Sequence, residues 1–528
     1  MKPAQGIRMR YLSIAAGLLA LAWVVAHAAL TPEELRGKQI YAQGSSVSGG
    51  DITAFVGAES VALPASAVPC ASCHGADGLG RPEGGVIPPD IRWNELTKVY
   101  GHVHSDGRRQ PAFDEDQLAR LITTGIDPGG NRLDQAMPLY RMSERDMADL
   151  VAYLKRLETD RDPGVKDDRI QVATLLPLSG PRGTLGQAMA QVLHAHFQEV
   201  NAHGGIFGRR LELLVIPFGT SSEDTLDNFR LAVEREGIFA LVGAYTVGMD
   251  QELLRLLRDE GMPLVGPFTL DPGDEVLNAA TFYLYAGFKE QARVLAETAL
   301  RDAPDGEMSA VLAGPLGEHV DRLVKSVQDQ LEGRTVTDPE MVRYPADGVG
   351  IELLAGRMAE SNPDTLFFFG GQSELQLLLA AFAERQQSPR VYLLSSFVPQ
   401  PLFDAPPTFH HRIFIAYPTL GSDISGSGRS EYEQLAHKHA LPPDHLQGQI
   451  AAYAAAKLMV EGLRRAGRDL NRQGLIDALE ELYAYETGVT PPLSYGPNRR
   501  VGARGAHVVA VDLIKKSYNP VGGWHELR

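Results

Sequence analysis

Two cysteines and a histidine stand close together in the stretch Cys70-Ala71-Ser72-Cys73-His74. These are the only cysteines in 528 residues, so no disulfide network competes for their thiols. A C-x-x-C pair alone would be compatible with zinc binding or thiol redox chemistry, but a histidine directly after the second cysteine is typical of c-type haem attachment. In that chemistry the two thiols form thioethers with the haem vinyl groups, and the histidine supplies an axial imidazole to the iron. The spacing predicts one covalently bound haem c, held by Cys70, Cys73 and His74.

A sixth ligand to the iron should follow further along the chain. Met137 lies in an A-M-P stretch that precedes a helical pattern. A methionine thioether opposite a histidine raises the haem potential and closes the iron to exogenous ligands, which suits electron transfer. Met142 and Met147 are rivals, although Met147 has the spacing of a packed helical residue. His102 or His104 would instead give a bis-histidine haem of lower potential. We predict Met137.

The segment 29–157 resembles a class I cytochrome c domain. The pieces that carry the resemblance are G-K-Q-I-Y at 37–41, C-A-S-C-H-G at 70–75, I-P-P at 87–89, G-I-D-P at 125–128, A-M-P at 136–138 and D-L-V-A-Y-L at 149–154. The resemblance implies a small all-α fold around one haem, with a proline carbonyl near 88–89 that orients His74. A Gly/Ser/Ala-rich insert from Ser45 to Val68 departs from the family pattern and is expected to be a surface loop.

The beginning of the chain has the pattern of a secretory signal peptide. Lys2, Arg8 and Arg10 precede an apolar run over 12–25, which is followed by A-H-A at 26–28. We therefore expect a signal peptide over 1–28 and a periplasmic protein, with an uncleaved N-terminal anchor as the alternative. No other apolar run reaches the roughly 18–20 residues of a membrane span. The net charge of −16 comes with no basic patch, which argues against nucleic acid as a partner.

A second pattern follows a charged, Pro/Gly-containing stretch at 158–168, which is expected to be a linker. Over 169–528 short apolar runs typical of buried strands alternate with amphipathic helical segments. This alternation predicts parallel α/β sheets. About 360 residues are too many for one ordinary sheet, so we expect two lobes. Ligands of such sheets bind at the carboxyl ends of the strands.

Residues 169–528 resemble a type I periplasmic solute-binding protein of the branched-chain amino acid receptor family. The resemblance is carried by L-P-L-S-G-P at 176–181, E-V-N-A-H-G-G-I-F-G-R-R-L at 199–211, L-V-G at 241–243, F-F-G-G at 368–371 and A-Y-A-A-A-K-L at 452–458. It implies two lobes joined by a three-strand hinge that close over a small organic solute. We expect lobe 1 over about 169–288 and 418–482, and lobe 2 over about 289–417 and 483–528.

The resemblance also implies which residues contact the solute. Ser179 and Gly180 match the first loop of the cleft, and Thr246 and Thr269 lie near hydroxyl positions that bind a solute carboxylate. Glu374 is nearest to the acidic residue that pairs with an ammonium group. For each hydroxyl, a helix cap or a turn is the structural alternative.

Two positions in the cleft differ from the family pattern. Receptors of this family usually carry tyrosine where this chain has Leu185 and Leu316. Losing both phenols makes the cleft more apolar. We therefore expect a small, partly apolar carboxylate rather than a free amino acid.

The sequence thus predicts an exported monohaem electron-transfer protein with a fused module that binds or senses a solute. Its redox partner would be a periplasmic dehydrogenase or a respiratory-chain cytochrome. The alternative is the substrate-binding component of an ABC-type amino acid or organic acid transporter, with a membrane permease as partner and an accessory haem. No motif for catalysis by a side chain is found, so an enzyme is not expected. The H-x-H pairs at 194/196 and 437/439 are expected to be surface histidines rather than a metal site.

Overall fold

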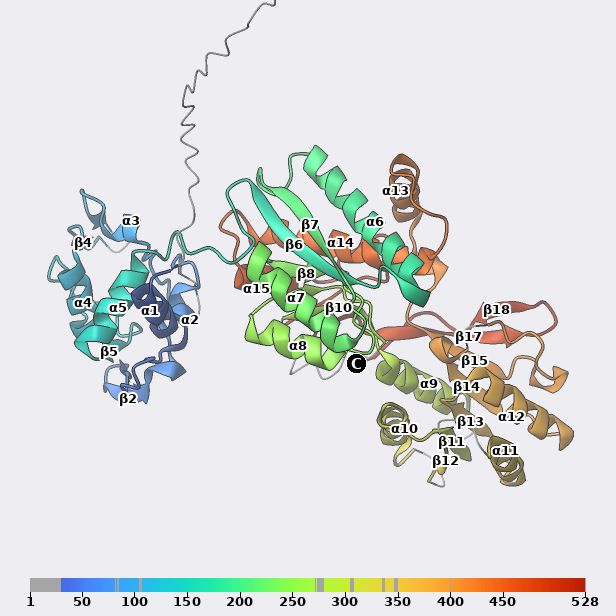
Figure 1. Cartoon of the computed structure of the whole chain (residues 1–528). Coiled ribbons are helices and arrows are strands. Elements are labelled where there is room, and N and C mark those ends of the chain that lie inside the picture. Colours follow the sequence, from blue (N-terminus) through green and yellow to red (C-terminus); the bar gives the residue numbers. More distant parts are fainter. Residues whose placement is uncertain are drawn as a thin grey trace, which may run out of the picture. The chain divides into compact units, whose positions relative to one another are not determined.

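A computed structural model describes residues 30–527 apart from 81, 83, 84, 104–106, 271, 273–279, 304–307, 335–337, 346–349 and 399. The predicted signal peptide and His104 lie outside the described residues. The chain divides into two compact units, Met1–Asp160 and Arg161–Arg528 (Figure 1). Within the described part, no helix is long and apolar enough to cross a membrane.

Helices are the main regular secondary structure in the described part of the first unit. They are α1 (Pro32–Gln43), α2 (Cys70–His74), α3 (Trp93–Leu96), α4 (Glu115–Thr124) and α5 (Glu144–Leu154). Polar residues fix where the longer ones begin, because each side chain satisfies an amide that has no partner within the helix. Thr31 and Asp114 form capping boxes at the starts of α1 and α4, and the Ser143 hydroxyl accepts from the Asp146 amide at the start of α5.

Helices α1 and α5 cross at very close range. At Gly37 a Cβ atom would stand 2.0 Å from the Asp149 carbonyl oxygen, so only glycine permits this approach. Arg36 closes the crossing with two hydrogen bonds to the buried Asp149 carboxylate, at 2.7 and 2.8 Å. One turn further along, the Tyr41 ring packs on Tyr153 with a centroid separation of 5.6 Å. The crossing thereby fixes the position of Tyr41 next to α2.

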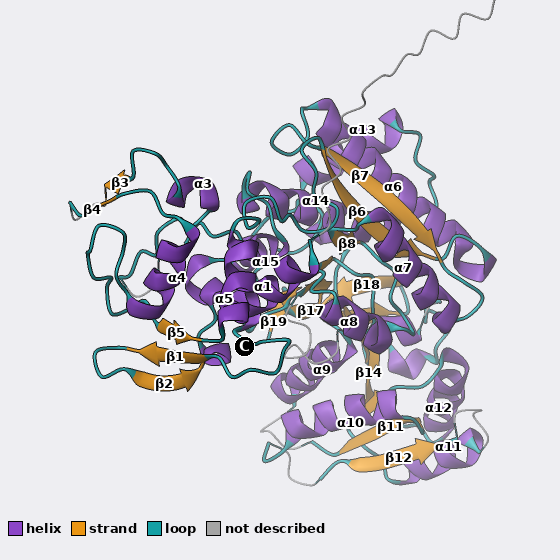
Figure 2. Cartoon of the chain, turned by 60° about the vertical axis from the view of Figure 1, so that its left-hand side comes forward, coloured by secondary structure: helices purple, strands orange, loops and turns teal. Residues whose placement is uncertain are grey.

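The first unit also contains short strands, and one of its expectations, a surface loop at 45–68, is corrected by them. The insert at 45–68 forms two strands, β1 (Thr53–Val56) and β2 (Val61–Pro64), rather than a surface loop. They join β5 (Leu139–Arg141) in an antiparallel sheet of order β2-β1-β5 (Figure 2). The reason is burial: Ile52, Ala54 and Ala65 of the insert belong to the core of this unit. A shorter ladder pairs β3 (His102–Val103) with β4 (Arg109–Gln110).

The second unit contains two sheets. The first is parallel throughout, with the order β16 (Val501–Ala503), β10 (Thr281–Tyr285), β9 (Leu264–Val265), β8 (Ala240–Val242), β6 (Arg169–Leu176) and β7 (Arg210–Pro217). Both faces are covered, as parallel sheets require. Along β6, Val172 and Leu176 pack on one core, whereas Ala173 and Leu175 pack on the other. The first core is completed by α6 (Gly183–Ala202), α14 (Leu446–Ala466) and α15 (Arg472–Glu480), and the second by α7 (Ser222–Glu236) and α8 (Asp250–Asp259).

The second sheet begins parallel and ends antiparallel. Its order is β12 (Glu340–Tyr344), β11 (Ala310–Pro315), β13 (Thr365–Phe368), β14 (Arg390–Leu394), β15 (Ile413–Tyr417), β17 (Gly505–Asp512) and β18 (Ser517–Pro520), with β19 (His525–Glu526) also paired to β17. Helices α9 (Phe288–Asp302) and α10 (Glu318–Leu331) share one core, and α11 (Ile351–Glu360) and α12 (Gln372–Glu384) share the other. Helix α13 (Gly426–Lys438) contacts α6 of the first lobe.

The chain passes between the two sheets after β10, after β15 and again between β16 and β17. These three crossings agree with the expected three-strand hinge. The expected lobe boundary at 483 is wrong, however. Val489, Leu493 and Tyr495 pack in the core of the first lobe, and β16 pairs with β10, so lobe 2 resumes only at β17.

The stretch at 158–168, expected to be a linker, contains the boundary between the two units, and each of its two halves is attached to its own unit. In the first unit, Asp160 accepts a hydrogen bond from the Tyr153 hydroxyl at 2.9 Å. In the second unit, Val165 is buried in the core of the first lobe, and Asp162 accepts a hydrogen bond from the Arg472 amide at 2.5 Å. The boundary between the units therefore falls at Asp160 and Arg161.

Candidate functional site

One apolar cavity of about 360 Å³ in the first unit brings the predicted haem ligands together. Cys70, Cys73, His74 and Met137 all line it. The remaining wall is mostly aliphatic or aromatic, with Tyr41, Ile87, Pro88, Pro89, Ile91, Leu96, Phe113, Leu118, Leu121, Ile122, Leu133, Leu150 and Leu154 among the lining residues. Helices that are far apart in sequence, α1, α2, α4 and α5, contribute to this wall.

His74 is fixed from two sides. It ends helix α2, and its ring is buried. Its Nδ1 lies 3.3 Å from the Pro89 carbonyl oxygen, which leaves Nε2 as the nitrogen with a free lone pair. Burial lowers the pKa of His74, and the hydrogen bond to Pro89 opposes this only in part. The imidazole is therefore neutral at neutral pH and able to ligate a metal. The proline carbonyl implied by the resemblance is that of Pro89.

The surroundings of α2 hold the C-x-x-C-H turn in place. The Tyr41 hydroxyl donates to the Gly75 carbonyl at 2.6 Å, and the Tyr140 hydroxyl donates to the Val68 carbonyl at 2.6 Å. These two bonds flank the turn on both sides.

The Cys70 thiol differs from the nucleophile of a redox-active C-x-x-C pair. Burial raises the pKa of the Cys70 thiol to about 12. Thiol oxidoreductases instead depress this pKa, because the thiolate is the nucleophile. Two thiols, a neutral imidazole and a thioether on one apolar cavity match the donor set of haem c, so the residues present fit this group.

The cavity also separates the candidates for the sixth ligand. Met142 and Met147 are not among its lining residues, and Met147 is packed in the core of the unit. Met137 and His102 both line the cavity. Met137 follows a turn in which its amide donates to the Asp134 carbonyl at 3.1 Å, whereas His102 is exposed on β3. Met137 remains the predicted ligand, with His102 as the alternative.

Four of the five predicted solute contacts follow neighbouring strands of the first lobe. Ser179 and Gly180 come after β6, Thr246 after β8 and Thr269 after β9. These strands are adjacent in the sheet, and Thr246 donates its amide to the Phe268 carbonyl at 3.0 Å. The sheet thus brings these residues to one edge, the edge where ligands of parallel sheets bind.

An aromatic cluster at the same edge was missed by the sequence reasoning. Tyr245 stacks on Phe268 with a centroid separation of 5.4 Å and meets Phe218 edge-on at 6.0 Å. The Arg182 guanidinium lies 5.7 Å from the centre of the Tyr245 ring. Arg182 is exposed and stands three residues after Ser179. This cation beside the first cleft loop would suit a carboxylate, and only its position after S-G-P could have drawn attention to it.

Two predicted contacts have partners within the protein. The buried Thr246 hydroxyl donates to Asp250 at 2.5 Å, at the start of α8. Glu374 follows β13 in the second lobe and accepts from the Gly371 amide in a capping box of α12. Both side chains therefore have a partner at a helix end.

The two leucines that replace family tyrosines lie in different surroundings. Leu185 is half-buried against the core of the first lobe, next to Gly448. Leu316 follows β11 in the second lobe and is 58% exposed.

Comparisons with known proteins cover both units. The family model described as periplasmic binding protein matches residues 169–517, and that described as cytochrome c matches residues 65–158. No curated protein matches the chain.

Solved structures of binding proteins resemble the second unit. A fatty acid ABC transporter substrate-binding protein from Thermomonospora curvata has 17% identity and a TM-score of 0.53, covering 70% of this chain and 95% of its own. A putative branched-chain amino acid ABC transporter from Rhodospirillum rubrum has 17% identity and a TM-score of 0.54, covering 67% and 100%. A branched-chain amino acid ABC transporter from Thermus thermophilus with bound valine has 15% identity and a TM-score of 0.53, and the match covers 68% of this chain and 97% of that one.

Proposed function

The chain belongs to the periplasmic binding protein family and carries a cytochrome c domain before that part, and on this premise we propose that it is an exported one-electron carrier whose second unit binds a small organic solute. The observation that carries the proposal is the apolar cavity on which Cys70, Cys73, His74 and Met137 converge. The redox partner would be a periplasmic dehydrogenase or a respiratory-chain cytochrome.

Each residue of the cavity has a separate task in this account. Haem c, when bound, supplies reversible one-electron chemistry at a tuned potential. Cys70 and Cys73 would hold it covalently. The neutral His74 ring, oriented by the Pro89 carbonyl, and the Met137 thioether would be the axial donors. The apolar wall excludes water, which favours a reduced metal centre of lower charge.

An electron carrier differs from a haem protein that binds oxygen because its iron has no coordination position open to an external ligand. With Met137 as a ligand, the reduced full-length protein should not bind carbon monoxide, and its visible spectrum should remain unchanged under the gas. Met137→Ala serves as the comparison, because removing the thioether should open the iron and give the carbon monoxide spectrum. Rapid carbon monoxide binding by the unaltered protein would contradict the electron-transfer assignment.

For the solute, we propose a small, partly apolar carboxylate at the carboxyl edge of the first-lobe sheet. Arg182 offers a cation beside the exposed Ser179 and Gly180, and the Phe218–Tyr245–Phe268 cluster offers an apolar surface. Among the structures with this fold, one is named for fatty acid transport and another holds valine, so the fold alone does not select the solute class.

Calorimetry with branched-chain amino acids and with the matching 2-oxo and aliphatic acids tests this choice. The acids should bind, and Arg182→Gln should weaken them roughly 10- to 150-fold, since a hydrogen bond to a charged group contributes about 1.5–3 kcal/mol. Arg230→Gln, an exposed arginine on α7 paired with Asp227, is the matched control and should have no effect. Tight binding of leucine or valine that is lost in Glu374→Ala would defeat the prediction and favour a transport receptor working with a membrane permease.

A further inference from the structure

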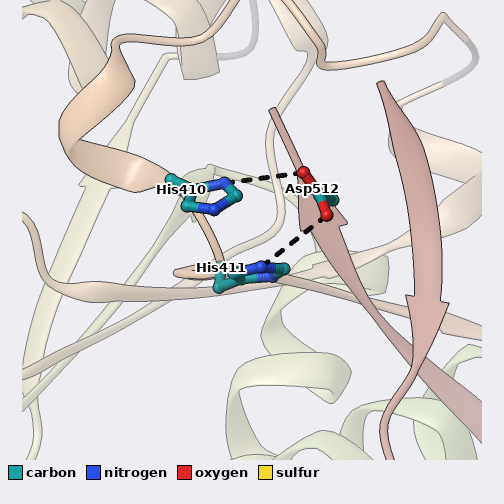
Figure 3. A group of neighbouring side chains, drawn as sticks. All are labelled: His410, His411 and Asp512. Carbon is teal, nitrogen blue, oxygen red and sulfur yellow. Dashed lines mark ion pairs between the residues drawn. The ribbon is translucent and has the colours of Figure 1, made fainter. Parts of the chain in front are cut away.

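Two adjacent histidines and an aspartate, none of them a residue of the two sites described above, meet at one end of the second-lobe sheet. His410 and His411 precede β15, and Asp512 ends β17 (Figure 3). Their ligand atoms all lie within 4.8 Å of one another, and among the described residues this is the one group of three His, Cys, Asp or Glu donors that is close enough to share an ion. The His410 and His411 rings each face one carboxylate oxygen at 3.8 Å.

The distances from the two histidine nitrogens to the Asp512 carboxylate can be compared with those of hydrogen bonds and of zinc ligands. At 3.8 Å they are too far apart for hydrogen bonds. A zinc ion bound at about 2.0–2.1 Å from each ligand needs ligand atoms about 3.3 Å apart in a tetrahedron. Each nitrogen–oxygen separation would have to shorten by about half an ångström, and the ligand atoms, all within 4.8 Å of one another, would have to approach by up to about 1.5 Å.

One of the three donors makes no hydrogen bond. The Nδ1 atom of His410 is buried and makes no hydrogen bond to any described residue. A buried polar atom without a hydrogen bond destabilises the folded protein unless a ligand binds it. Figure 3 shows this ring directed toward Asp512. A cation between them would satisfy the atom.

The surrounding backbone holds the donors in position. The His411 amide donates to the Val511 carbonyl at 3.1 Å, which joins the start of β15 to the residue before Asp512. The Asp512 carboxylate accepts from the amides of Ile514 and Lys515 and from the Asn519 side chain, at 3.1, 2.8 and 3.3 Å. Such outer contacts are what orients a metal-ligating carboxylate.

The positive charges nearby have other partners. The Arg412 guanidinium donates to the Ser388 carbonyl at 3.0 Å, and the Lys516 ammonium lies 3.7 Å from Asp404.

We infer that His410, His411 and Asp512 form a binding site for one divalent transition-metal ion of the zinc class. Two imidazoles and a carboxylate are the ligands such ions select, and the three of them leave a fourth position for water. His411 is half-exposed, so an ion can reach the site from solvent. The ion would tie β15 to β17 within the second lobe. It is separate from the haem iron and from the solute edge.

The experiment uses the tag-free, full-length, haem-containing protein after treatment with a chelator. Zinc chloride is titrated by calorimetry, and zinc per chain is measured by elemental analysis. We expect saturable uptake of one zinc ion per chain. His411→Asn and His410→Gln should each weaken zinc binding by more than about 100-fold, since loss of even an outer-shell partner costs 10–100-fold. Asparagine is chosen at 411 because this residue has a φ of +56°, which asparagine tolerates.

His439→Gln is the matched control, because His439 also pairs with a carboxylate, Glu199, but without a second imidazole. It should leave zinc uptake unchanged. The haem spectrum checks that each variant carries its cofactor. No zinc uptake by the unaltered protein, or unchanged affinity in His411→Asn and His410→Gln, overturns the inference. Should His410→Gln fail to fold, His411→Asn, altered at a half-exposed position, decides the outcome alone.

Discussion

Replacing both Cys70 and Cys73 by serine should remove all covalently attached haem from the exported protein. Serine hydroxyls cannot form the thioethers, and the chain has no other cysteine to replace them. The substitutions themselves remove little packing, since Cys73 is exposed and Cys70 only borders the core of this unit. Acid–acetone extraction should leave haem on the unaltered protein and strip it completely from the double variant.

The single variant Cys73→Ser is the matched control for this prediction. It retains Cys70 and should keep one thioether, seen as one unreacted vinyl in the pyridine haemochrome spectrum. Covalent haem in the double variant, or colour that extracts from the unaltered protein, would show that the C-x-x-C-H turn is not the attachment site.

Met137→Ala should lower the haem potential by a few hundred millivolts, a part of the roughly 0.8 V over which axial ligands set haem potentials. A thioether stabilises the reduced iron, and its replacement by water or by His102 stabilises the oxidised one. Met142→Ala is the control, because that residue packs against the core without lining the cavity. It should leave the potential unchanged.

His102→Gln covers the remaining alternative in the same series. His102 lines the cavity. In a bis-histidine centre, the loss of His102 would raise the haem potential and change the spectrum. Under our assignment His102→Gln leaves both unchanged. If the haem potential shifted strongly in His102→Gln and not in Met137→Ala, the sixth ligand would be His102 on β3.

The haem site could be predicted from sequence because its chemistry is local. Cys70, Cys73 and His74 lie within one helical turn, so spacing alone specifies their task. The sixth ligand required a choice among several methionines and histidines. The cavity reduced the candidates to Met137 and His102. The strand–helix alternation over 169–528 likewise predicted parallel sheets, because sheets buried on both faces need continuous apolar strands such as β6.

The parts that sequence could not supply depend on contacts between distant segments. Nothing local indicates that Ile52 and Ala54 become core residues, so the insert had the pattern of a loop. The hydrogen bond from the Arg472 amide to Asp162 joins residues 310 positions apart and attaches the second half of the linker to the second unit. The edge strand β16 is only three residues long and follows a turn-rich segment without periodicity.

The same reason explains why the sequence did not show the intramolecular partners of two predicted solute contacts. Thr246 and Glu374 stand at family positions for solute contacts, but their helix-end partners, Asp250 and the Gly371 amide, become visible only in the fold. Adjacent histidines followed by an aspartate 101 residues later form no motif. Only the antiparallel pairing of β15 with β17 brings His410 and His411 to Asp512.

A spectroscopic redox titration of the unaltered, full-length protein tests the central claim most directly. We predict one reversible one-electron step, with a near-infrared sulfur-to-iron band in the oxidised form that is absent from Met137→Ala. More than one step, or an oxidised form with a bis-histidine spectrum and no such band, would contradict an electron carrier with one haem held between His74 and Met137.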